Sequence, residues 1–319
     1  MGIKNLTKLL QRFAPNSIKY IDISSLSNKT FAIDANLMIY KSLYAIRKSM
    51  GKDIIRKDKS ITHIYTMFFK LVGFKRHNIN PIFVFDGIPQ RIKHKSLTKR
   101  KKQWKIMNEK FINAKTDEEK KRYFYGSKGV TQKEYDDIKK LILLFGFQYI
   151  DAPEEADAQC AILNKTKKVH GVITDDLDVL LFGGVNIIKD FTVATKKKMK
   201  LININEVLKG LKITFDQFVE LSILLGTDYL EPIEGIGTIG AYKLLKEYDN
   251  IDNMIADKLI PQDYDYELVK KYVEIPITID YKVVKEKDIN MDELKEFMIE
   301  IGLMENKLII KYLDSLINR

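Results

Sequence analysis

Three short apolar segments, each closed by an aspartate, constrain the fold of this chain more than any other feature. They cover residues 31–34, 82–86 and 171–178 and end in Asp34, Asp86 and Asp178. Continuous apolar runs with helical stretches between them are typical of parallel strands buried on both faces. In such sheets the ligand site lies beyond the carboxyl ends of the strands. The sequence therefore predicts an α/β fold with a central, mostly parallel sheet and an acidic site at one edge.

Helical segments are expected between and after these strands. Residues 91–125 are rich in Lys, Arg, Glu and Gln and predict a charged helical excursion from the sheet. Residues 130–147 predict an amphipathic helix that leads into a strand at 147–150, and a helix with an acidic first turn follows Pro153. From about Phe215 the sequence predicts mostly helix to the end of the chain.

Composition narrows the classes of function. The chain has 54 basic and 43 acidic residues and a net charge of +11, which favours a polyanionic partner such as nucleic acid. A basic protein without such a partner is the alternative. The longest apolar runs fall far short of the roughly 20 residues that a membrane helix needs. The single cysteine, Cys160, excludes an internal disulfide, and the start of the chain has no apolar signal core. We expect an intracellular protein, in the nucleus or the cytoplasm, that is neither secreted nor bound to a membrane.

The acids at the predicted sheet edge, together with others in similar settings, indicate a metal site. Several carboxylates close together repel one another, and divalent cations relieve that repulsion. Mg²⁺ prefers oxygen ligands, and two ions about 3.5–4 Å apart suit phosphoryl displacement. The alternative is that each acid merely caps a helix or closes a turn. The predicted ligands are Asp34, Asp86, Glu155, Asp157, Asp176, Asp178 and Asp228, serving two Mg²⁺ ions for which Mn²⁺ can substitute.

Ordered sequence blocks carry a resemblance to the flap-endonuclease branch of the 5′-nuclease superfamily. They occur in the family's order and spacing over roughly residues 1–250, which makes the set highly specific. Asp157 stands where the family often has Glu, and Ile88 replaces a usual Lys. The blocks are Met1-Gly2-Ile3, Ile33-Asp34-Ala35, Phe83-Val-Phe-Asp86-Gly87, Ala152-Pro-Glu-Glu155-Ala-Asp157-Ala, Thr174-Asp-Asp176-Leu-Asp178, Leu224-Leu-Gly-Thr-Asp228-Tyr229 and Gly235-Ile-Gly237-Thr-Ile-Gly240-Ala241.

The resemblance implies a fold and an activity. It implies a PIN-like nuclease core over residues 1–215, with a helical arch inserted at about 88–132. A helical region with a helix-turn-helix, continuous with the core, is implied over 216–319. The implied activity is cleavage of DNA near single-strand/double-strand junctions, as a 5′ flap endonuclease with 5′ exonuclease action, in replication or repair. DNA with a 5′ flap, nick, gap or junction is therefore the expected partner.

Basic, aromatic and glycine residues gain roles from the same resemblance. Lys93 and Arg100, seven residues apart, match the arch-base residues that contact the scissile phosphate, although a solvated basic face is the alternative. Tyr40 matches a base-stacking position, with core packing as its alternative. Arg47 is expected near the bend between duplex arms, and Gly2 is also expected at the DNA. Gly235, Gly237 and Gly240 are expected to let the backbone approach a phosphate of duplex DNA. In relatives a monovalent cation often joins this contact, so K⁺ is a further expected cation.

Other functions remain as alternatives. The first is a sibling 5′ exonuclease or Holliday-junction resolvase on the same core. The second is a non-catalytic DNA-binding protein, but such copies usually lose their metal acids. A haloacid-dehalogenase-like phosphatase would need a nucleophilic Asp-x-Asp, which Asp34-Ala-Asn36 does not supply. The last residues lack the Gln-x-x-aliphatic-x-x-aromatic-aromatic motif by which relatives bind a sliding clamp, so we expect no clamp binding through the C-terminus, and we expect a monomer.

Overall fold

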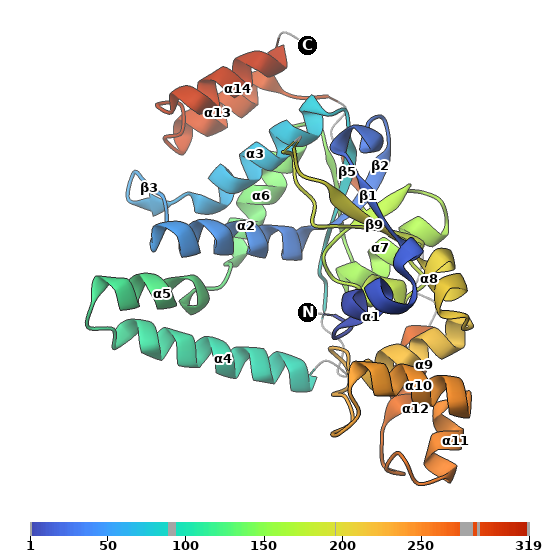
Figure 1. Cartoon of the computed structure of the whole chain (residues 1–319). Helices are drawn as coiled ribbons and strands as arrows, with labels where there is room; N and C mark the ends of the chain where they lie inside the picture. Colours follow the sequence, from blue (N-terminus) through green and yellow to red (C-terminus); the bar gives the residue numbers. More distant parts are fainter. Residues whose placement is uncertain (1, 89–93, 195, 275–282, 286–287, 318–319) are drawn as a thin grey trace. The chain divides into compact units, whose positions relative to one another are not determined.

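The computed structural model describes residues 2–88, 94–194, 196–274, 283–285 and 288–317. Its contacts divide the chain into two compact units, each assembled from separate stretches of sequence. Unit 1 is drawn from residues 1–25, 87–96 and 153–280, and unit 2 from residues 26–86, 97–152 and 281–319. Figure 1 labels the helices and some of the strands. The domain boundary expected between residues 215 and 216 stays a prediction.

Unit 1 combines a mixed sheet with helices. Within its described residues the strand order is β1-β9-β8-β7, with β7 and β8 parallel and the other neighbours antiparallel. Its elements are α1 (Leu6–Phe13), β1 (Ile18–Ile21), α7 (Ala156–Lys165), β7 (Gly171–Ile173), β8 (Asn186–Lys189), β9 (Met199–Asn203), α8 (Ile204–Leu211), α9 (Phe215–Leu225), α10 (Thr238–Tyr248), α11 (Ile251–Ala256) and α12 (Tyr266–Glu274), with short 3₁₀ turns at Pro15–Ser17, Ile23–Leu26 and Asp178–Leu180.

Unit 2 contains the predicted parallel strands. Its described strands follow the order β2-β5-β6-β10, parallel except for the last pair, and β3 and β4 form a separate hairpin. Its elements are β2 (Thr30–Asp34), α2 (Ala35–Met50), β3 (Ile55–Arg56), β4 (Lys59–Ser60), α3 (Thr62–Arg76), β5 (Asn80–Phe85), α4 (His94–Ile112, whose first residues fall in unit 1), α5 (Asp117–Ser127), α6 (Gln132–Leu144), β6 (Gln148–Asp151), β10 (Val283–Lys285), α13 (Met291–Glu300) and α14 (Lys307–Ile317).

Local sequence explains several boundaries. Capping boxes start α5 at Thr116 and α6 at Thr131: in each, the Thr hydroxyl accepts from a backbone N–H and the side chain of a Glu three residues later accepts from the Thr backbone N–H.

The core of unit 2 contains an aromatic group. The ring centroids of Phe74 and Phe83 lie 6.0 Å apart, and the ring of Phe145 stacks on that of Phe147 at 6.4 Å. These contacts fix α3 and α6 against β5 and so hold the carboxyl end of that strand in place.

The predicted α/β architecture is confirmed. Strands occupy the three aspartate-ended segments, and the charged excursion forms α4 and α5, which Figure 1 shows as a helical hairpin. One departure lies in the region expected to be helical, where Val283–Lys285 forms β10 and pairs antiparallel with β6. Its β-branched valines suit an added edge strand. No helix among the described residues is both long enough and apolar enough to cross a membrane.

Candidate metal centre and nucleic-acid interface

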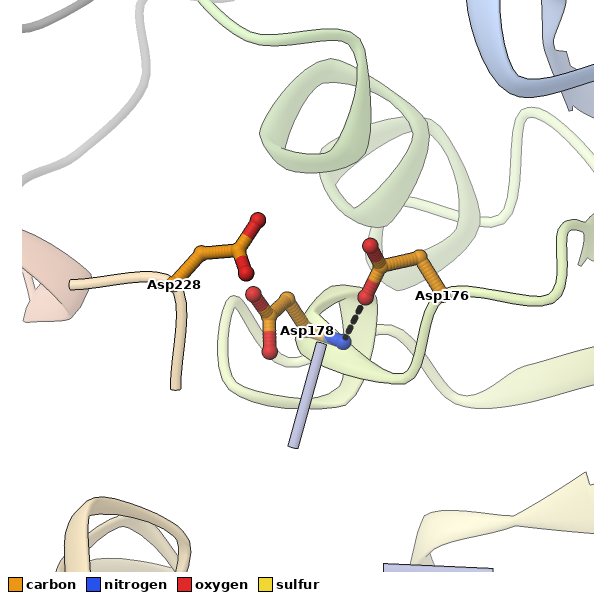
Figure 2. A group of neighbouring side chains, drawn as sticks. All are labelled: Asp176, Asp178 and Asp228. Carbon is orange, nitrogen blue, oxygen red and sulfur yellow. Dashed lines mark hydrogen bonds between the residues drawn. The ribbon is translucent and has the colours of Figure 1, made fainter. Parts of the chain in front are cut away.

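Three aspartates of unit 1 converge, and we call Asp176, Asp178 and Asp228 the acid cluster. Each offers one carboxylate oxygen, and these oxygens all lie within 4.8 Å of one another. Figure 2 shows the three carboxylates turned toward a common space. Asp176 is 6% exposed and Asp178 is fully buried. The chain therefore gathers three acids in a confined, largely water-excluded place.

Two tight turns put these side chains there. The loop after β7 is closed by the hydroxyl of Thr174, which accepts from the Asp176 amide at 3.1 Å, and by the Asp176 carboxylate, which accepts from the Asp178 amide at 3.0 Å. The second turn follows α9, which ends at Gly226 with φ 91, a conformation that favours glycine. In this turn the Thr227 amide donates to the Leu230 carbonyl at 2.9 Å, and Asp228 lies between these two residues.

Glu155 and Asp157 belong to the same unit, and Glu155 is linked to the Asp228 turn through the buried phenol of Tyr229. Tyr229 donates to Glu155 Oε2 at 2.8 Å. Burial, followed by the charges of Asp178 and Glu155, raises the pKa of Tyr229 well above its usual value, and Asp157 adds to that effect. The pKa of Tyr272 in α12 is raised in the same way, by burial first and then by Glu155. Tyr229 therefore stays protonated and remains a hydrogen-bond donor to Glu155.

The donor set fits divalent metal ions. Three carboxylates at this spacing repel one another strongly in a low-dielectric setting, and a cation removes that cost. All ligand atoms are oxygens, the donor type that Mg²⁺ and Mn²⁺ prefer. Asp176, Asp178 and Asp228 are therefore suited to hold such an ion. Glu155 and Asp157 lie close enough for their charges to act on Tyr229, the neighbour of Asp228.

Gly2 lies against the acid cluster. Its φ is +77, and a Cβ built there would stand 2.0 Å from the Asp176 carboxylate oxygen Oδ1. The neighbouring Lys4 amide donates to the Gly226 carbonyl at 2.9 Å, which joins the start of the chain to the Asp228 turn. Gly2 thus contacts a predicted metal ligand. The DNA contact expected of Gly2 stays a prediction.

Unit 2 carries the remaining acids at adjacent strand ends. Asp34 closes β2 and caps α2 by accepting from the Leu37 amide at 2.9 Å. Asp86 follows β5, the parallel neighbour of β2, and its amide donates to Asn36 Oδ1 at 3.3 Å. Burial and then the charges of Asp86 and Asp34 raise the pKa of Tyr135 to about 12. The two strands therefore end in a paired acidic edge, as the sequence predicted.

Comparisons with known proteins identify the family. Models of the XPG N-terminal domain and the XPG I-region match residues 1–106 and 146–228. Flap endonuclease 1 of Plasmodium yoelii yoelii is 35% identical over 344 aligned positions, which cover 99% of this chain and 71% of that protein. This chain belongs to the flap endonuclease family.

Solved structures agree with this family in their fold. Flap Endonuclease-1 from Methanococcus jannaschii superposes with a TM-score of 0.72 at 27% identity, covering 94% of this chain and 95% of that one. The catalytic core of Rad2 in complex with a DNA substrate gives a TM-score of 0.75 at 24% identity, covering 99% and 100%. The expected PIN-like α/β fold of the flap endonuclease family is therefore confirmed.

Arg47, which the resemblance placed near the bend between duplex arms, is a buried residue of α2. Its side chain is only 2% exposed. Nε pairs with Asp53 Oδ1 at 2.8 Å, and Nη1 donates to the Lys128 carbonyl at 2.9 Å. Two of its three guanidinium nitrogens are thus engaged within unit 2. The ion pair with Asp53 accounts for the burial of this charge, and the DNA contact expected of Arg47 stays a prediction.

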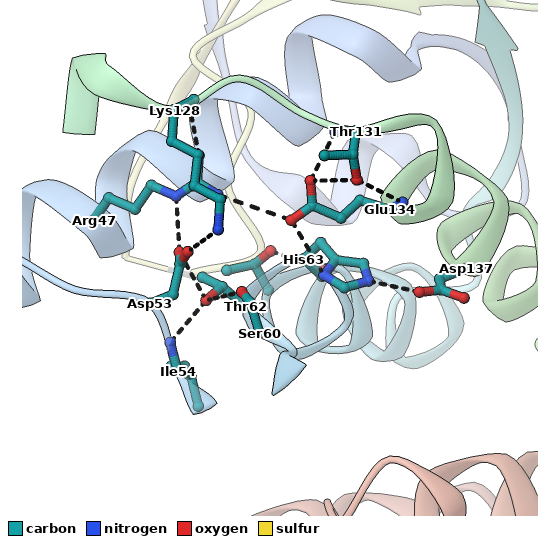
Figure 3. Close-up of polar contacts among 11 residues, drawn as sticks. Arg47, Asp53, Ile54, Ser60, Thr62, His63, Lys128, Thr131, Glu134 and Asp137 are labelled. Atoms are coloured by element: carbon teal, nitrogen blue, oxygen red, sulfur yellow. Dashed lines mark hydrogen bonds and ion pairs between the residues drawn. The ribbon is translucent and has the colours of Figure 1, made fainter. Parts of the chain in front are cut away.

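We call the surrounding set the buried ion-pair network. Lys128 Nζ also binds Asp53, at 2.9 Å, and His63 bonds to Asp137 at 3.1 Å with Glu134 3.8 Å from its other ring nitrogen. Figure 3 shows how these contacts join α2, α3, α6 and the segment that leaves α5. The network comprises Arg47, Asp53, Thr62, His63, Lys128, Thr131, Glu134 and Asp137.

The other predicted contacts of the family are accessible where the structure describes them. Tyr40 is 45% exposed, so core packing does not explain it, and its ring lies 6.3 Å from that of Tyr44. Arg100 is an exposed residue of α4. Lys93 lies outside the described residues. Roles for these side chains at a nucleic acid stay predictions.

The glycines before and within α10 leave open space. Gly237 caps the helix and Gly235 has φ +84, and a Cβ at either would meet nothing within 4 Å. At Gly240, in the first turn, the nearest atom would be 3.9 Å away. The backbone is therefore accessible here, as a phosphate contact would need, and that contact is still a prediction.

Sequence reasoning missed two kinds of contact between distant residues. Tyr229 was within a quoted block, yet its bond to Glu155 depends on a residue far away in sequence. The partners of Arg47 were missed because Asp53, Glu134 and Lys128 come from separate segments. For Tyr229 the signal was its place beside Asp228; for the network no local pattern exists.

Proposed function

We propose that this chain is a magnesium-dependent, structure-specific nuclease that hydrolyses DNA phosphodiesters at 5′ flaps. The observation that carries the proposal is the acid cluster, three convergent carboxylates within 4.8 Å, in a member of the flap endonuclease family. The relatives' printed name supplies the substrate class, and the net charge of +11 is consistent with a polyanionic substrate. A DNA substrate also implies an intracellular site of action.

The predicted ligands would hold two divalent ions. In unit 1 the predicted ligands are Asp176, Asp178, Asp228, Glu155 and Asp157. The sequence blocks also predict Asp34 and Asp86 of unit 2 as ligands. When bound, the ions supply a water of lowered pKa and stabilise the charge on the phosphate. Tyr229 keeps its proton and, by donating to Glu155, would hold that carboxylate in its orientation. Either Mg²⁺ or Mn²⁺ suits this oxygen donor set.

The chain's other residues would bind and orient the DNA. Arg100 and Lys93 would neutralise charge on the scissile phosphate, and exposed Tyr40 would stack on a base without reading sequence. The backbone at Gly235, Gly237 and Gly240 would approach a duplex phosphate, with K⁺ as a further cation there. Contacts of this kind recognise shape, so a flap, nick, gap or junction rather than a sequence would be bound.

Cleavage of labelled DNA tests the proposal. Wild-type chain should cut a 5′-flap substrate in Mg²⁺, and EDTA should abolish cutting. Asp176→Ala should retain DNA binding but lose cutting, whereas the control Asp263→Ala, at an exposed acid of unit 1, should cut normally. Equal cutting by wild type and Asp176→Ala would reject the assignment.

The same assay separates the sibling activities. Nicked, gapped and four-way-junction DNA should be compared with the flap at matched concentrations. Preference for the flap supports the proposal, while preference for the four-way junction would place the chain with the resolvases. A monomer in solution, with no C-terminal binding to a sliding clamp, completes the proposal and is checked by light scattering and by deletion of the last ten residues.

A further inference from the structure

We call residues 174–178 the acidic loop. Asp175 lies in this loop, between Thr174 and Asp176, but does not belong to the acid cluster. Both of its oxygen-bearing groups are engaged by the end of β8. Its carboxylate Oδ1 accepts from the Asp190 amide at 2.7 Å, and its carbonyl accepts from Lys189 Nζ at 2.6 Å. We call Asp175, Lys189, Asp190 and Lys200 the tether.

The tether rests on the sheet of unit 1. Strands β7 and β8 pair in parallel up to Ile173 and Ile188, and the Thr174 amide then donates to the Ile188 carbonyl at 3.2 Å. Asp190 follows β8 with φ 60, and its carboxylate pairs with Lys200 of β9 at 2.8 Å. Paired strands therefore hold the groups that bind Asp175, so the loop is fixed to a rigid support.

The acidic loop has a reason to need such support. Asp176 and Asp178 must approach each other and Asp228, although their charges repel. On one side Asp176 meets the backbone of Gly2. The tether fixes the backbone immediately before Asp176. The bonds at both the carbonyl and the side chain of Asp175 oppose the opening of the loop that would relieve this repulsion.

The geometry points to Asp175 and Lys189 as positioning residues, which hold the loop of Asp176 and Asp178 in the arrangement that binds divalent cations. This inference rests on the proposed metal site. Groups that orient metal ligands commonly contribute about 10–100-fold to metal affinity. Asp175 acts here through a hydrogen bond that it accepts, and Lys189 through one that it donates.

The competing role for Asp175 is that of a metal ligand, and two substitutions separate the roles. Asp175→Asn keeps a side-chain oxygen that can accept from the Asp190 amide but removes the negative charge. Asp175→Ala removes both. A positioning role predicts that Asn preserves most of the cation affinity that Ala loses, whereas a ligand role predicts similar losses for both.

The experiment measures Mn²⁺ binding to the full chain without DNA, by calorimetry, with thermal unfolding in EDTA as a second readout. We expect Asp175→Ala and Lys189→Met to weaken Mn²⁺ binding at least about tenfold. Asp175→Asn and Lys189→Arg should stay within about threefold of wild type. The matched control is Lys168→Met, at an exposed lysine of the same unit. In EDTA, Lys189→Met should unfold close to the wild-type temperature.

Each outcome decides the inference. Unchanged Mn²⁺ affinity in both Asp175→Ala and Lys189→Met would overturn it, as would an Asn variant as weak as the Ala variant. A large fall in unfolding temperature for both Asp175→Asn and Lys189→Arg, with lost affinity, would reduce the tether to a purely structural contact. Absence of Mn²⁺ binding in the wild type would instead refute the proposed metal site, so the two failures are distinguishable.

Discussion

The acid cluster of unit 1 and the buried ion-pair network of unit 2 both hold carboxylates away from water, but with different partners. In the network, Asp53 contacts Arg47 and Lys128 directly, and His63 lies between Glu134 and Asp137. In the cluster, carboxylates face carboxylates within 4.8 Å, and their described hydrogen bonds include a backbone amide and, at nearby Glu155, a phenol.

The ion-pair network therefore stabilises the fold, whereas the acid cluster is suited to bind a cation. Acids matched by the chain's own cations lose stability when a partner is removed, because a buried charge remains uncompensated. Acids that crowd together gain stability when one charge is removed, unless a bound cation was compensating them. The two regions should therefore respond in opposite ways to neutralising substitutions, and the following predictions test that opposition.

The largest expected effect is that of Asp178→Asn. In Mg²⁺ the variant should cut 5′-flap DNA at least about a hundredfold more slowly than wild type, because a ligand of the proposed ions is lost. In EDTA its unfolding temperature should equal or exceed that of the wild type, because repulsion is relieved. Gel cleavage assays and calorimetry measure the two effects. A strongly destabilised variant in EDTA would break the comparison.

Arg47→Met should destabilise the fold by about 3–5 kcal/mol, because it leaves Asp53 buried with less compensation. Denaturant-induced unfolding of the wild type and the variant measures this change in the free energy of unfolding. Lys52→Met, at an exposed position close by, is the control and should stay within about 0.5 kcal/mol of wild type. If Arg47→Met were as stable as Lys52→Met but bound DNA more weakly, the structural role would be refuted and the DNA contact predicted for Arg47 would be supported.

Gly2→Ala should weaken Mn²⁺ binding about tenfold or more, because the added Cβ would displace Asp176, which lies 2.0 Å from its position. The backbone at φ +77 adds strain of about 1–2 kcal/mol. Gly129→Ala, where a Cβ would meet nothing within 4 Å, is the matched control. Equal Mn²⁺ affinity in both variants would show that Asp176 tolerates movement.

The smallest effect concerns pH and His63. Burial lowers the pKa of His63, although Asp137, Glu134 and Asp53 act in the opposite direction. Below about pH 6.5 the unfolded chain therefore binds more protons than the folded chain, and stability falls as pH falls. His63→Gln should flatten this dependence of the unfolding temperature between about pH 7.5 and 5.5. A steeper dependence in His63→Gln would contradict the lowered pKa.

Much of the fold followed from local pattern. The strands that end at Asp34 and Asp86, and the loop that carries Asp176, are buried runs bounded by turns, so periodicity and turn residues define them. The start of the helix that follows Thr131 is marked by its capping box. The family blocks then placed the acids of the candidate site, because their order and spacing are specific.

The remainder depended on contacts between distant segments. Nothing near Arg47 in sequence shows that Asp53, Glu134 and Lys128 surround it. Asp175 and Asp176 are adjacent and chemically identical, and only the position of β8 decides which one faces the cluster and which one is bonded to Asp190. Strand β10 likewise requires the edge of β6. Local propensity carries no information on such partners.

Anomalous diffraction from crystals of the full chain grown with Mn²⁺ tests the central claim most directly. The account predicts a manganese peak within coordination distance of the carboxylates of Asp176, Asp178 and Asp228, and its loss in Asp178→Asn. A well-ordered acid cluster without a manganese peak would contradict the claim that these acids are gathered to bind metal.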